Sequence, residues 1–494
     1  MAQAIKMKKE PRLDLKHNAF PFQAEAVDFA ASLDYSAIFY EQGLGKTKIA
    51  IDLIVRWLGG RELDTILVVT KKGLIQNWMK EFDAHSYLMP QILTSDKGSN
   101  YSILHSPARV ILCNYEAVAK ESRLHQYLKL RNVGVIVDES AKIKNPHSAI
   151  TEAFFSLSPL FKKRVIMTGT PFANRPEDIW AQIFFLDQGK ALGVDYGDFK
   201  KGVNLSNSLF TDAEEQQEYA ESLDSIFEKI KHFSIRETKA GSGLSLPNKV
   251  YQNIVCDWEH RQLELYHSIR QEEKYALIRE GNIIRESSDE VLKRMLRLLQ
   301  AASNPLLINE AYSQDPGKYA QLEILLSTIS ARGEKCIIWT SFVENAEWLF
   351  RRLKEYSPRL IHGGVPIGQR TRNVNSFQEE DSIRVLVAVP AAAKEGLTLT
   401  AANNVIFWDR SFSLDDYLQA QDRIHRISQT RICYVYNLLM ENSIDLWVDS
   451  LLEAKEQSAK LAQQDISIGE YCERADYSFA DVFRRVLGIG EKNG

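Results

Sequence analysis

The stretch EQGLGKT, residues 41–47, joins a short apolar run to a helical pattern and has the residue types of a phosphate site. Residues 36–40 predict a buried strand, and residues 46–58 have apolar side chains at helical spacing. A glycine-rich turn between a strand and a helix N-terminus directs backbone N–H groups and the positive end of the helix dipole at one point. The expected ligands of phosphate and phosphate-bound Mg²⁺ are Gly43, Leu44, Gly45, Lys46 and Thr47, with Lys46 at the β- and γ-phosphates and Thr47 at the metal.

A pair of acidic residues supports the phosphate site. The P-loop pattern is incomplete, because Tyr40 stands where the pattern has glycine, and a plain glycine-containing loop is the alternative. Asp138 and Glu139, however, end a second apolar run, residues 134–138. Carboxylates at a strand tip beside a phosphate loop suit two tasks, since Asp138 can hold Mg²⁺ and Glu139 can orient and deprotonate the attacking water. The alternative for this pair is a turn with two solvated acids.

The sequence Thr168-Gly169-Thr170-Pro171 follows the next apolar run and has two interpretations. Glycine and proline favour a plain turn. Thr168 and Thr170 could instead form a hydroxyl pair that senses the γ-phosphate and relays its state.

The most specific stretch is QAQDRIHRISQ, residues 419–429. On a helix Gln419, Arg423 and Arg426 fall at i, i+4 and i+7 and form one stripe. Two guanidinium groups aimed the same way suit arginine fingers, and reaching a phosphate in another lobe would tie hydrolysis to lobe closure. The alternative is a solvated helix face on which Asp422 pairs with Arg426.

Apolar runs that alternate with helical stretches position these motifs. They are residues 36–40, 64–70, 109–113, 134–138 and 164–168, and then 335–340, 359–361, 384–389, 403–408 and 433–438. Such Val/Ile-rich runs predict an α/β fold with two lobes, each a parallel sheet covered on both faces. Ligands of open parallel sheets bind beyond the carboxyl ends of the strands, and the motifs follow those ends.

Between the two blocks, at about residues 172–325, the pattern changes to long charged helices without strand-like runs, most clearly at 212–231 and 258–299. Gly, Ser and Pro cluster at 239–249, which is a hinge candidate. A polar amphipathic helix is expected at about 443–464, followed by a tail. The expected domains are an N-terminal lobe with a first helical protrusion (1–250), a C-terminal lobe that starts with a second protrusion (251–465), and the tail (466–494).

The composition is that of a globular protein with more than one domain. The chain has 494 residues, 45% hydrophobic and 26% charged, which is too long for a single core. A net charge of −4 means that any nucleic-acid site must be a local basic groove. The five cysteines are scattered without a CxxC pair, which argues against a metal cluster or disulfide framework. Without a secretory signal or membrane-spanning run, a cytoplasmic protein is expected, nucleoid-associated or, if viral, in the host cytoplasm.

Together the motifs resemble helicase superfamily two and, within it, the SWI/SNF-type DNA-dependent ATPases, over about residues 18–460. In chain order they are PFQAEAV, EQGLGKT, ILVVTKKGLIQNW, VILCNYEAV, VIVDESAKIKN, MTGTPFANRPEDIW, IIWTSF, HGGVPIGQR, AAAKEGLTLTAANNVIFWDRS and QAQDRIHRISQ. The helical insertions and FSIRETKAGSGLSLP resemble the two protrusions and the inter-lobe linker of that family. The resemblance implies two RecA-like lobes. The chain has no recognisable reader segment, which favours a compact, prokaryotic- or phage-like member.

The resemblance also implies roles for individual residues. Gln23 would read the adenine of ATP, Gln419 would help to close the ATP site, and Arg423 and Arg426 would be the fingers. Residues in the motifs that line the DNA groove would touch sugar and phosphate without reading the sequence, and these are Thr70, Lys71, Asn114, Tyr115, Ser341, Thr398 and Thr400. Each could instead be a loop residue that caps a strand or helix. Trp78 and Trp408 are expected in the core.

One position departs from the family. Where the family usually has DEAH or DESH, this chain has Asp138-Glu139-Ser140-Ala141. The missing imidazole helps to couple hydrolysis to nucleic acid in the family, and Ala141 cannot form a side-chain hydrogen bond there. The departure puts coupling in question, but not catalysis.

The function that the resemblance implies is an ATP- and Mg²⁺-dependent translocase or remodeller that acts on double-stranded DNA and not on membranes. A neighbouring alternative is a helicase that separates strands or remodels and anneals forks. An alternative of another class is an ATP-gated nucleic-acid sensor or clamp that does not cycle. The pathway and an unidentified protein partner stay open.

Overall fold

The computed structural model describes residues 11–94, 96–172, 175–203, 213–279, 288–393 and 399–474, and it divides into two compact units. The first comprises Met1–Asn207, Glu214–Leu244 and Ser458–Tyr471, and the second is built mainly from Ser245–Gln457. The division at Leu244 falls inside the hinge candidate, residues 239–249. The predicted contact residue Thr398 and most of the expected tail lie outside the described residues.

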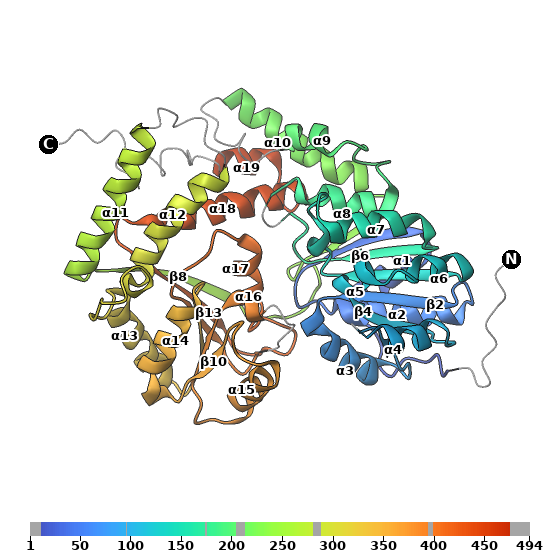
Figure 1. The fold of residues 1–494 in the computed structure, drawn as a ribbon, viewed down its shortest axis with the longest axis horizontal. Coiled ribbons are helices and arrows are strands. Elements are labelled where there is room, and N and C mark those ends of the chain that lie inside the picture. The colour runs from blue at the N-terminus through green and yellow to red at the C-terminus, as the bar shows by residue number, and fades with distance from the viewer. Residues whose placement is uncertain are drawn as a thin grey trace. The chain divides into compact units, whose positions relative to one another are not determined.

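The first unit is built around a seven-stranded sheet with the order β3-β4-β2-β5-β6-β1-β7 (Figure 1). Its strands are β1 (Tyr35–Tyr40), β2 (Thr65–Thr70), β3 (Gln91–Ile92), β4 (Val110–Asn114), β5 (Val133–Asp138), β6 (Lys163–Met167) and β7 (Ser234–Glu237). Every pairing in this sheet is parallel. The carboxyl ends of the strands therefore lie along one edge.

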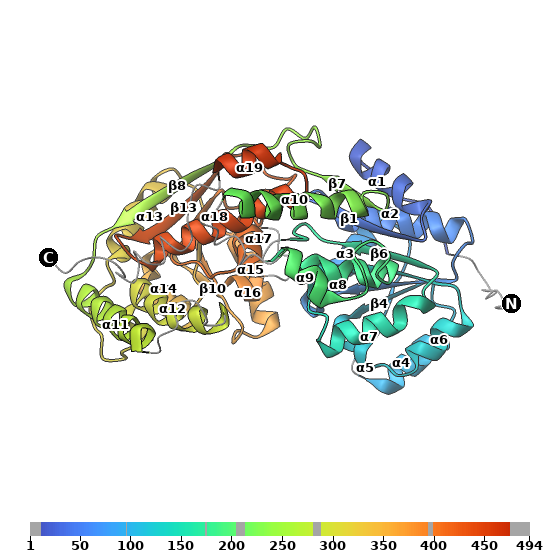
Figure 2. The same cartoon turned by 90° about the horizontal axis from the view of Figure 1, so that it is seen from above.

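Helices cover both faces of this sheet. They are α1 (Pro21–Ala31), α2 (Lys46–Gly59), α3 (Ile75–His85), α4 (Lys97–Leu104), α5 (Tyr115–Lys120), α6 (Leu124–Leu130), α7 (Ala149–Leu157), α8 (Asp178–Asp187), α9 (Tyr196–Val203) and α10 (Ala213–Ile230). Helices α1, α2 and α3 share one apolar cluster with the strands, and Figure 2 shows α5, α7 and α8 on the side opposite α1 and α2. Burial on both faces explains why the central strands are nearly continuous apolar runs.

The second unit contains a six-stranded parallel sheet with the order β10-β11-β9-β12-β13-β8. Its strands are β8 (Lys249–Cys256), β9 (Cys336–Trp339), β10 (Arg359–Ile361), β11 (Val385–Ala388), β12 (Asn404–Phe407) and β13 (Cys433–Met440). Its helices are α11 (His260–Arg279), α12 (Ser288–Ser303), α13 (Lys318–Ala331), α14 (Val343–Arg352), α15 (Ile367–Glu379), α16 (Pro390–Ala393) and α17 (Leu414–Gln421). Helix α18 (Ile444–Ala462) begins in this unit, and α19 (Ile468–Arg474) follows it.

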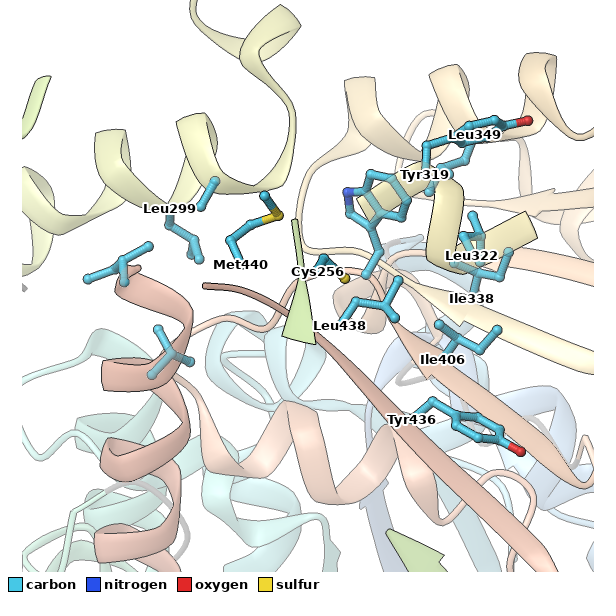
Figure 3. Packing of buried hydrophobic residues seen from close by; sticks show 14 of the residues in the cluster. Cys256, Leu299, Tyr319, Leu322, Ile338, Leu349, Ile406, Tyr436, Leu438 and Met440 are labelled. Atoms are coloured by element: carbon cyan, nitrogen blue, oxygen red, sulfur yellow. The ribbon is translucent and has the colours of Figure 1, made fainter. Parts of the chain in front are cut away.

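The core of the second unit lies on both faces of its sheet. On one face Leu322 of α13 packs near Ile338 of β9, and Leu299 of α12 lies beside Met440 at the end of β13 (Figure 3). On the other face α15 and α17 pack against the outward side chains of the same strands. None of the helices in the described part of the chain combines the length and the apolar character needed to cross a membrane.

The predicted α/β fold with two lobes, each built on a parallel sheet, is confirmed. All ten predicted strands form within two residues of their expected ends. The short strand β3 was not predicted, and two further strands, β7 and β8, lie in the stretch that was expected to be helical, so that expectation was wrong there. Both are edge strands, and β8 is partly exposed along most of its length. An edge strand needs no continuous apolar run, which explains the missing signal.

Candidate nucleotide-binding site

The phosphate loop has the predicted strand–turn–helix geometry. Strand β1 ends at Tyr40 and helix α2 begins at Lys46. Gly43 has φ 90° and Gly45 has φ 78°, which is the left-handed region where a side chain would be strained. Gly45 is the residue before the first turn of α2, so the N-terminal end of this helix, where backbone N–H groups and the positive end of the dipole favour an anion, lies at the loop.

The loop lysine is folded back into its own loop. Lys46 Nζ donates hydrogen bonds to the carbonyl oxygens of Tyr40 at 2.9 Å and Glu41 at 3.3 Å. Only 8% of the Lys46 surface is exposed. Its charge also favours the ionised form of Asp138. The ammonium group therefore already lies in the region that phosphates would occupy.

Tyr40, which replaces the glycine of the P-loop pattern, has a structural task. Its hydroxyl group donates a 2.7 Å hydrogen bond to the carbonyl of Phe22 and so fixes the first turn of α1. The next residue, Gln23, is 3% exposed and contacts the phosphate loop through a 3.0 Å bond from Nε2 to the Leu44 carbonyl. Gln23 Oε1 accepts a bond from the Phe20 backbone N–H. The role of Gln23 at adenine stays a prediction, but Gln23 is not an ordinary exposed residue.

The hinge candidate is attached to the phosphate loop. The backbone N–H of Lys239 donates to Glu41 Oε2 at 2.7 Å, and Lys239 Nζ lies 3.7 Å from Glu41 Oε1. On the neighbouring strand β7, Arg236 donates to the Phe39 carbonyl at 2.8 Å and pairs with Asp465. The chain after α10 thus holds β1 and the loop that follows it.

Asp138 is the buried carboxylate of the acidic motif. It ends β5, and its Oδ2 accepts hydrogen bonds from Thr70 Oγ1 at 3.0 Å and from Trp78 Nε1 at 2.9 Å. Burial and the neighbouring charge of Glu139 raise the pKa of Asp138 to about 6. The donors Trp78 and Thr70 and the ammonium of Lys46 oppose this rise.

Glu139 has an unusual backbone conformation that its neighbours hold. Its φ of 57° and ψ of 50° are left-handed, and a short 3-10 helix, Ser140–Ile143, follows it. The Tyr115 hydroxyl donates to the carbonyl oxygens of Asp138 at 2.5 Å and Glu139 at 3.0 Å. Burial and the two carboxylates raise the pKa of Tyr115, which keeps the phenol protonated as a donor. Lys71 Nζ lies 3.6 Å from Glu139 Oε2.

Two of the predicted nucleic-acid contacts face this acidic motif instead of solvent. Thr70 and Tyr115 are 0% and 1% exposed, and both donate to Asp138 or Glu139. To touch a nucleic-acid backbone they would have to leave these bonds, so the structure favours a positioning role. Asn114 fits its alternative interpretation, because its Oδ1 caps α5 by accepting from the Ala117 N–H at 2.8 Å. Lys71 keeps 23% of its side chain exposed.

The Thr168–Thr170 stretch lies beside the phosphate loop. Thr168 follows β6 and is fully buried, and its Oγ1 accepts a 3.2 Å bond from the Thr170 backbone N–H. A Cβ atom at Gly169 would come within about 3 Å of the Gln42 side chain, so glycine permits the close approach of the two loops. Whether the threonines sense phosphate stays a prediction.

The first-unit candidates therefore form a row along the carboxyl edge of one sheet. In strand order they are Asn114 after β4, Lys71 after β2, the acidic motif after β5, Thr168 after β6 and the phosphate loop after β1. The acidic motif lies between the predicted backbone contacts and the phosphate loop. Parallel topology produces this row from residues that are far apart in sequence.

The arginine motif of the second unit differs from its prediction. Helix α17 ends at Gln421, so Gln419, Arg423 and Arg426 do not share one helical stripe. The carbonyl of Arg423 accepts from the Leu399 N–H, and that of Ile424 accepts from Gln429 Nε2 at 3.0 Å. These two donors, one of them distant in sequence, replace the helical ones, which explains why the helix stops. Arg423 is only 7% exposed, so a solvated helix face is also wrong for it.

Ser341, another candidate of the second unit, lies beside a buried aspartate that sequence reasoning missed. Asp409, after β12, accepts from Thr340 Oγ1 at 2.6 Å, Ser303 Oγ at 2.7 Å and the Ser341 N–H at 2.6 Å. Its carboxylate thereby fixes the predicted contact residue Ser341. Thr400 lies elsewhere, with its Oγ1 3.2 Å from Ser428 Oγ. Gln419 Nε2 donates to Asp415 at 2.8 Å.

Trp78 is the functional residue that sequence reasoning left out of the site. It was expected in the core, as was Trp408, and both are buried, at 1% and 0% exposed. The indole N–H of Trp78 nevertheless reaches the Asp138 carboxylate across the sheet edge. The order of elements gave a partial signal, because α3 directly follows β2. That β2 pairs with β5, which brings Trp78 to Asp138, could not be seen from periodicity or composition.

Comparison with known proteins places this site in a family. Residues 22–307 match the SNF2-related domain, and residues 317–428 match the helicase conserved C-terminal domain. The first match alone spans more than half of the 494 residues. The two matches together define the class of protein as the helicase-like ATPases. The chain belongs to the SNF2-related family.

Several curated proteins are similar to most of this chain. The ISWI chromatin-remodeling complex ATPase ISW2 of Saccharomyces cerevisiae is 25% identical over 87% of this chain and 39% of its own length. The putative ATP-dependent helicase/translocase YwqA of Bacillus subtilis is 25% identical over 84% of this chain and 45% of its own. The chain thus spans less than half the length of these relatives. Among solved structures, the Sulfolobus solfataricus SWI2/SNF2 ATPase core in complex with dsDNA is 24% identical, with a TM-score of 0.43 over 97% of this chain and 99% of that one.

Proposed function

We propose that this chain hydrolyses ATP in order to move along double-stranded DNA, gripping the sugar–phosphate backbone and not the bases. The observation that carries the proposal is the row at the sheet edge, where Glu139 lies between the phosphate loop and Lys71. Relatives are named as translocases, helicases or remodelling ATPases, which supports the class of activity. Backbone contacts by lysine would make the affinity strongly salt-dependent.

The residues of the first unit supply the chemistry of phosphoryl transfer to water. Glu139 orients the attacking water and accepts its proton as the bond from water oxygen to the γ-phosphorus forms and the bond to the β,γ-bridging oxygen breaks. Lys46 and the N–H groups at the start of α2 stabilise the charge on the phosphates. Arg423 and Arg426 are proposed to act as fingers on the same phosphates.

Mg²⁺ fits the residues that are present. Hydrogen bonds within the described residues reach only Oδ2 of Asp138, so Oδ1 remains for a metal-bound water. No group of three His, Cys, Asp or Glu side chains in that part of the chain forms a metal cage. Asp138 and the Thr47 hydroxyl would therefore hold the ion together with the substrate phosphates, as Mg²⁺ prefers. When bound, the ion neutralises charge on the β- and γ-phosphates.

The test is steady-state ATP hydrolysis with no nucleic acid, single-stranded DNA, duplex DNA or RNA. Duplex should raise turnover most, and Glu139→Gln should abolish it in every condition without loss of fold. Lys46→Ala should behave in the same way. Full activity of purified Glu139→Gln protein would refute the assignment of the base, and turnover that ignores duplex would refute the proposed function.

Movement is tested separately from hydrolysis. A translocase should displace a third strand from a triplex while it leaves both strands of a blunt duplex paired. Release of a strand from a forked duplex would favour the helicase alternative. Slow turnover with tight, nucleotide-dependent binding of duplex would favour the sensor or clamp.

A further inference from the structure

The ion pair between Lys71 and Glu139 joins the candidate catalytic base to a residue at the surface. Lys71 directly follows β2, which is paired with β5, and Glu139 directly follows β5. Lys71 Nζ lies 3.6 Å from Glu139 Oε2. The two side chains are 23% and 13% exposed, so the lysine is accessible while the carboxylate is largely covered.

Several hydrogen bonds hold the backbone of Glu139, but its side chain can still rotate. Tyr115 bonds the carbonyl oxygens of residues 138 and 139, and the Lys142 N–H donates to the Glu139 carbonyl at 3.0 Å. A change in the position of the carboxylate must therefore come from side-chain rotation. The partner that pulls on the carboxylate then decides where it points.

The ammonium group of Lys71 and the attacking water compete for the same carboxylate. A base must offer an oxygen within hydrogen-bond distance of the water. An ammonium group beside Oε2 attracts that oxygen and turns the carboxylate toward β2. The pair is partly exposed, so the attraction is modest and a stronger anion can displace it.

A nucleic-acid phosphate is such an anion. It carries a full charge, and lysine is a strong ligand for it as a mobile point charge. The neighbouring position 141, in the 3-10 helix Ser140–Ile143, is alanine and has no side-chain donor or acceptor. Ala141 therefore cannot link a nucleic-acid phosphate to Glu139 through its side chain, and Lys71, from outside the acidic motif, is the candidate for that link.

We propose that Lys71 is a positioning residue that restrains Glu139 until a DNA backbone phosphate takes its ammonium group. Without DNA, Lys71 holds the carboxylate away from the water and turnover is slow. With DNA, Lys71 turns to the phosphate, and the carboxylate is released to the water. The proposal rests on the proposed function for the identity of the anion, but the restraint itself is a property of the first unit alone.

The test starts without DNA. Lys71→Met keeps the aliphatic stem and removes the charge, and it should raise DNA-free turnover by about two- to fivefold, the upper part of the range expected for a partly exposed ion pair. Lys71→Arg keeps the charge and should raise DNA-free turnover clearly less than Lys71→Met does. Lys72→Met removes the same charge from the adjacent, exposed position and is the matched control, expected to leave DNA-free turnover unchanged. The double variant Lys71→Met/Glu139→Gln should be inactive, which shows that the gained turnover uses Glu139.

Stimulation by duplex provides the second readout. In Lys71→Met the ratio of stimulated to DNA-free turnover should fall, mainly because the DNA-free rate rises. If Lys71 were only a DNA contact, its loss would instead raise only the DNA concentration needed for half-saturation. An unchanged or lower DNA-free rate in Lys71→Met overturns the restraint. If duplex leaves wild-type turnover unchanged, the proposed function fails. The restraint is then decided by the DNA-free rates alone: a higher rate in Lys71→Met than in wild type supports it, and an equal or lower rate overturns it.

Discussion

Replacing Trp78 by phenylalanine removes one hydrogen-bond donor from a buried carboxylate and keeps an aromatic ring in the core. Trp78 Nε1 lies 2.9 Å from Asp138 Oδ2, and its ring packs against Phe82 with centroids 5.9 Å apart. A hydrogen bond to a charged group contributes about 1.5–3 kcal/mol. Because this bond favours only the ionised form, its loss should raise the pKa of Asp138 above its already elevated value of about 6.

The expected effect is a displaced pH profile. Asp138 is proposed to hold Mg²⁺ as a carboxylate, so kcat/KM for ATP should be lost as the pH falls through its pKa in the free enzyme. At about 1.4 kcal/mol for each pH unit, the acid limb should move up by about one to two pH units. The variant should therefore be impaired near neutral pH and should approach the wild-type rate at about pH 9.

The assay has a matched control in the same unit. Trp57 is also 1% exposed, but its indole nitrogen makes no hydrogen bond within the described residues. Trp57→Phe should lose similar packing and leave the acid limb in place, whereas Thr70→Val, which removes the other donor to Oδ2, should move it in the same direction as Trp78→Phe. If the Trp78→Phe and Trp57→Phe profiles coincide, the bond to Asp138 has no influence on catalysis and the reasoning is refuted.

Three further predictions concern the same edge of the sheet. The pKa of Asp138 is raised by folding, so the contribution of its protonated form to stability is present at low pH and is lost as the pH rises through about 6. Asp138→Asn should therefore raise the free energy of unfolding more at about pH 8 than at about pH 4.5, by up to about 3 kcal/mol. An equal gain at both pH values would contradict this sign. Tyr115→Phe removes the donor that holds the Glu139 backbone and should lower kcat about tenfold with little change in ATP affinity, as measured by nucleotide titration; a change confined to affinity would count against the positioning role. Ala141→His should keep or strengthen stimulation by duplex, and a large loss of stimulation would show that the neighbourhood is arranged differently from the family.

Local patterns were sufficient for the elements whose signal lies within a few residues. The phosphate loop was predictable because glycine at positions 43 and 45 permits left-handed turns between an apolar strand and an amphipathic helix. Both sheets were predictable because strands buried on two faces must be apolar along their length. The edge strand β8 escaped for the opposite reason, since its exposed face accepts polar residues.

The sequence by itself determined the motifs, the α/β class and the order of the elements, because these follow from periodicity and turn chemistry along the chain. The tertiary structure decided what each side chain faces. Thr70 and Tyr115 could be read as surface contacts until the pairing of β2 with β4 and β5 brought them to the acidic motif. In the second unit, the Leu399 N–H donates to the Arg423 carbonyl, and helix α17 stops where sequence spacing would have continued it. Such partners are distant in sequence, and a local pattern carries no record of hydrogen bonds that form only when strands and loops meet.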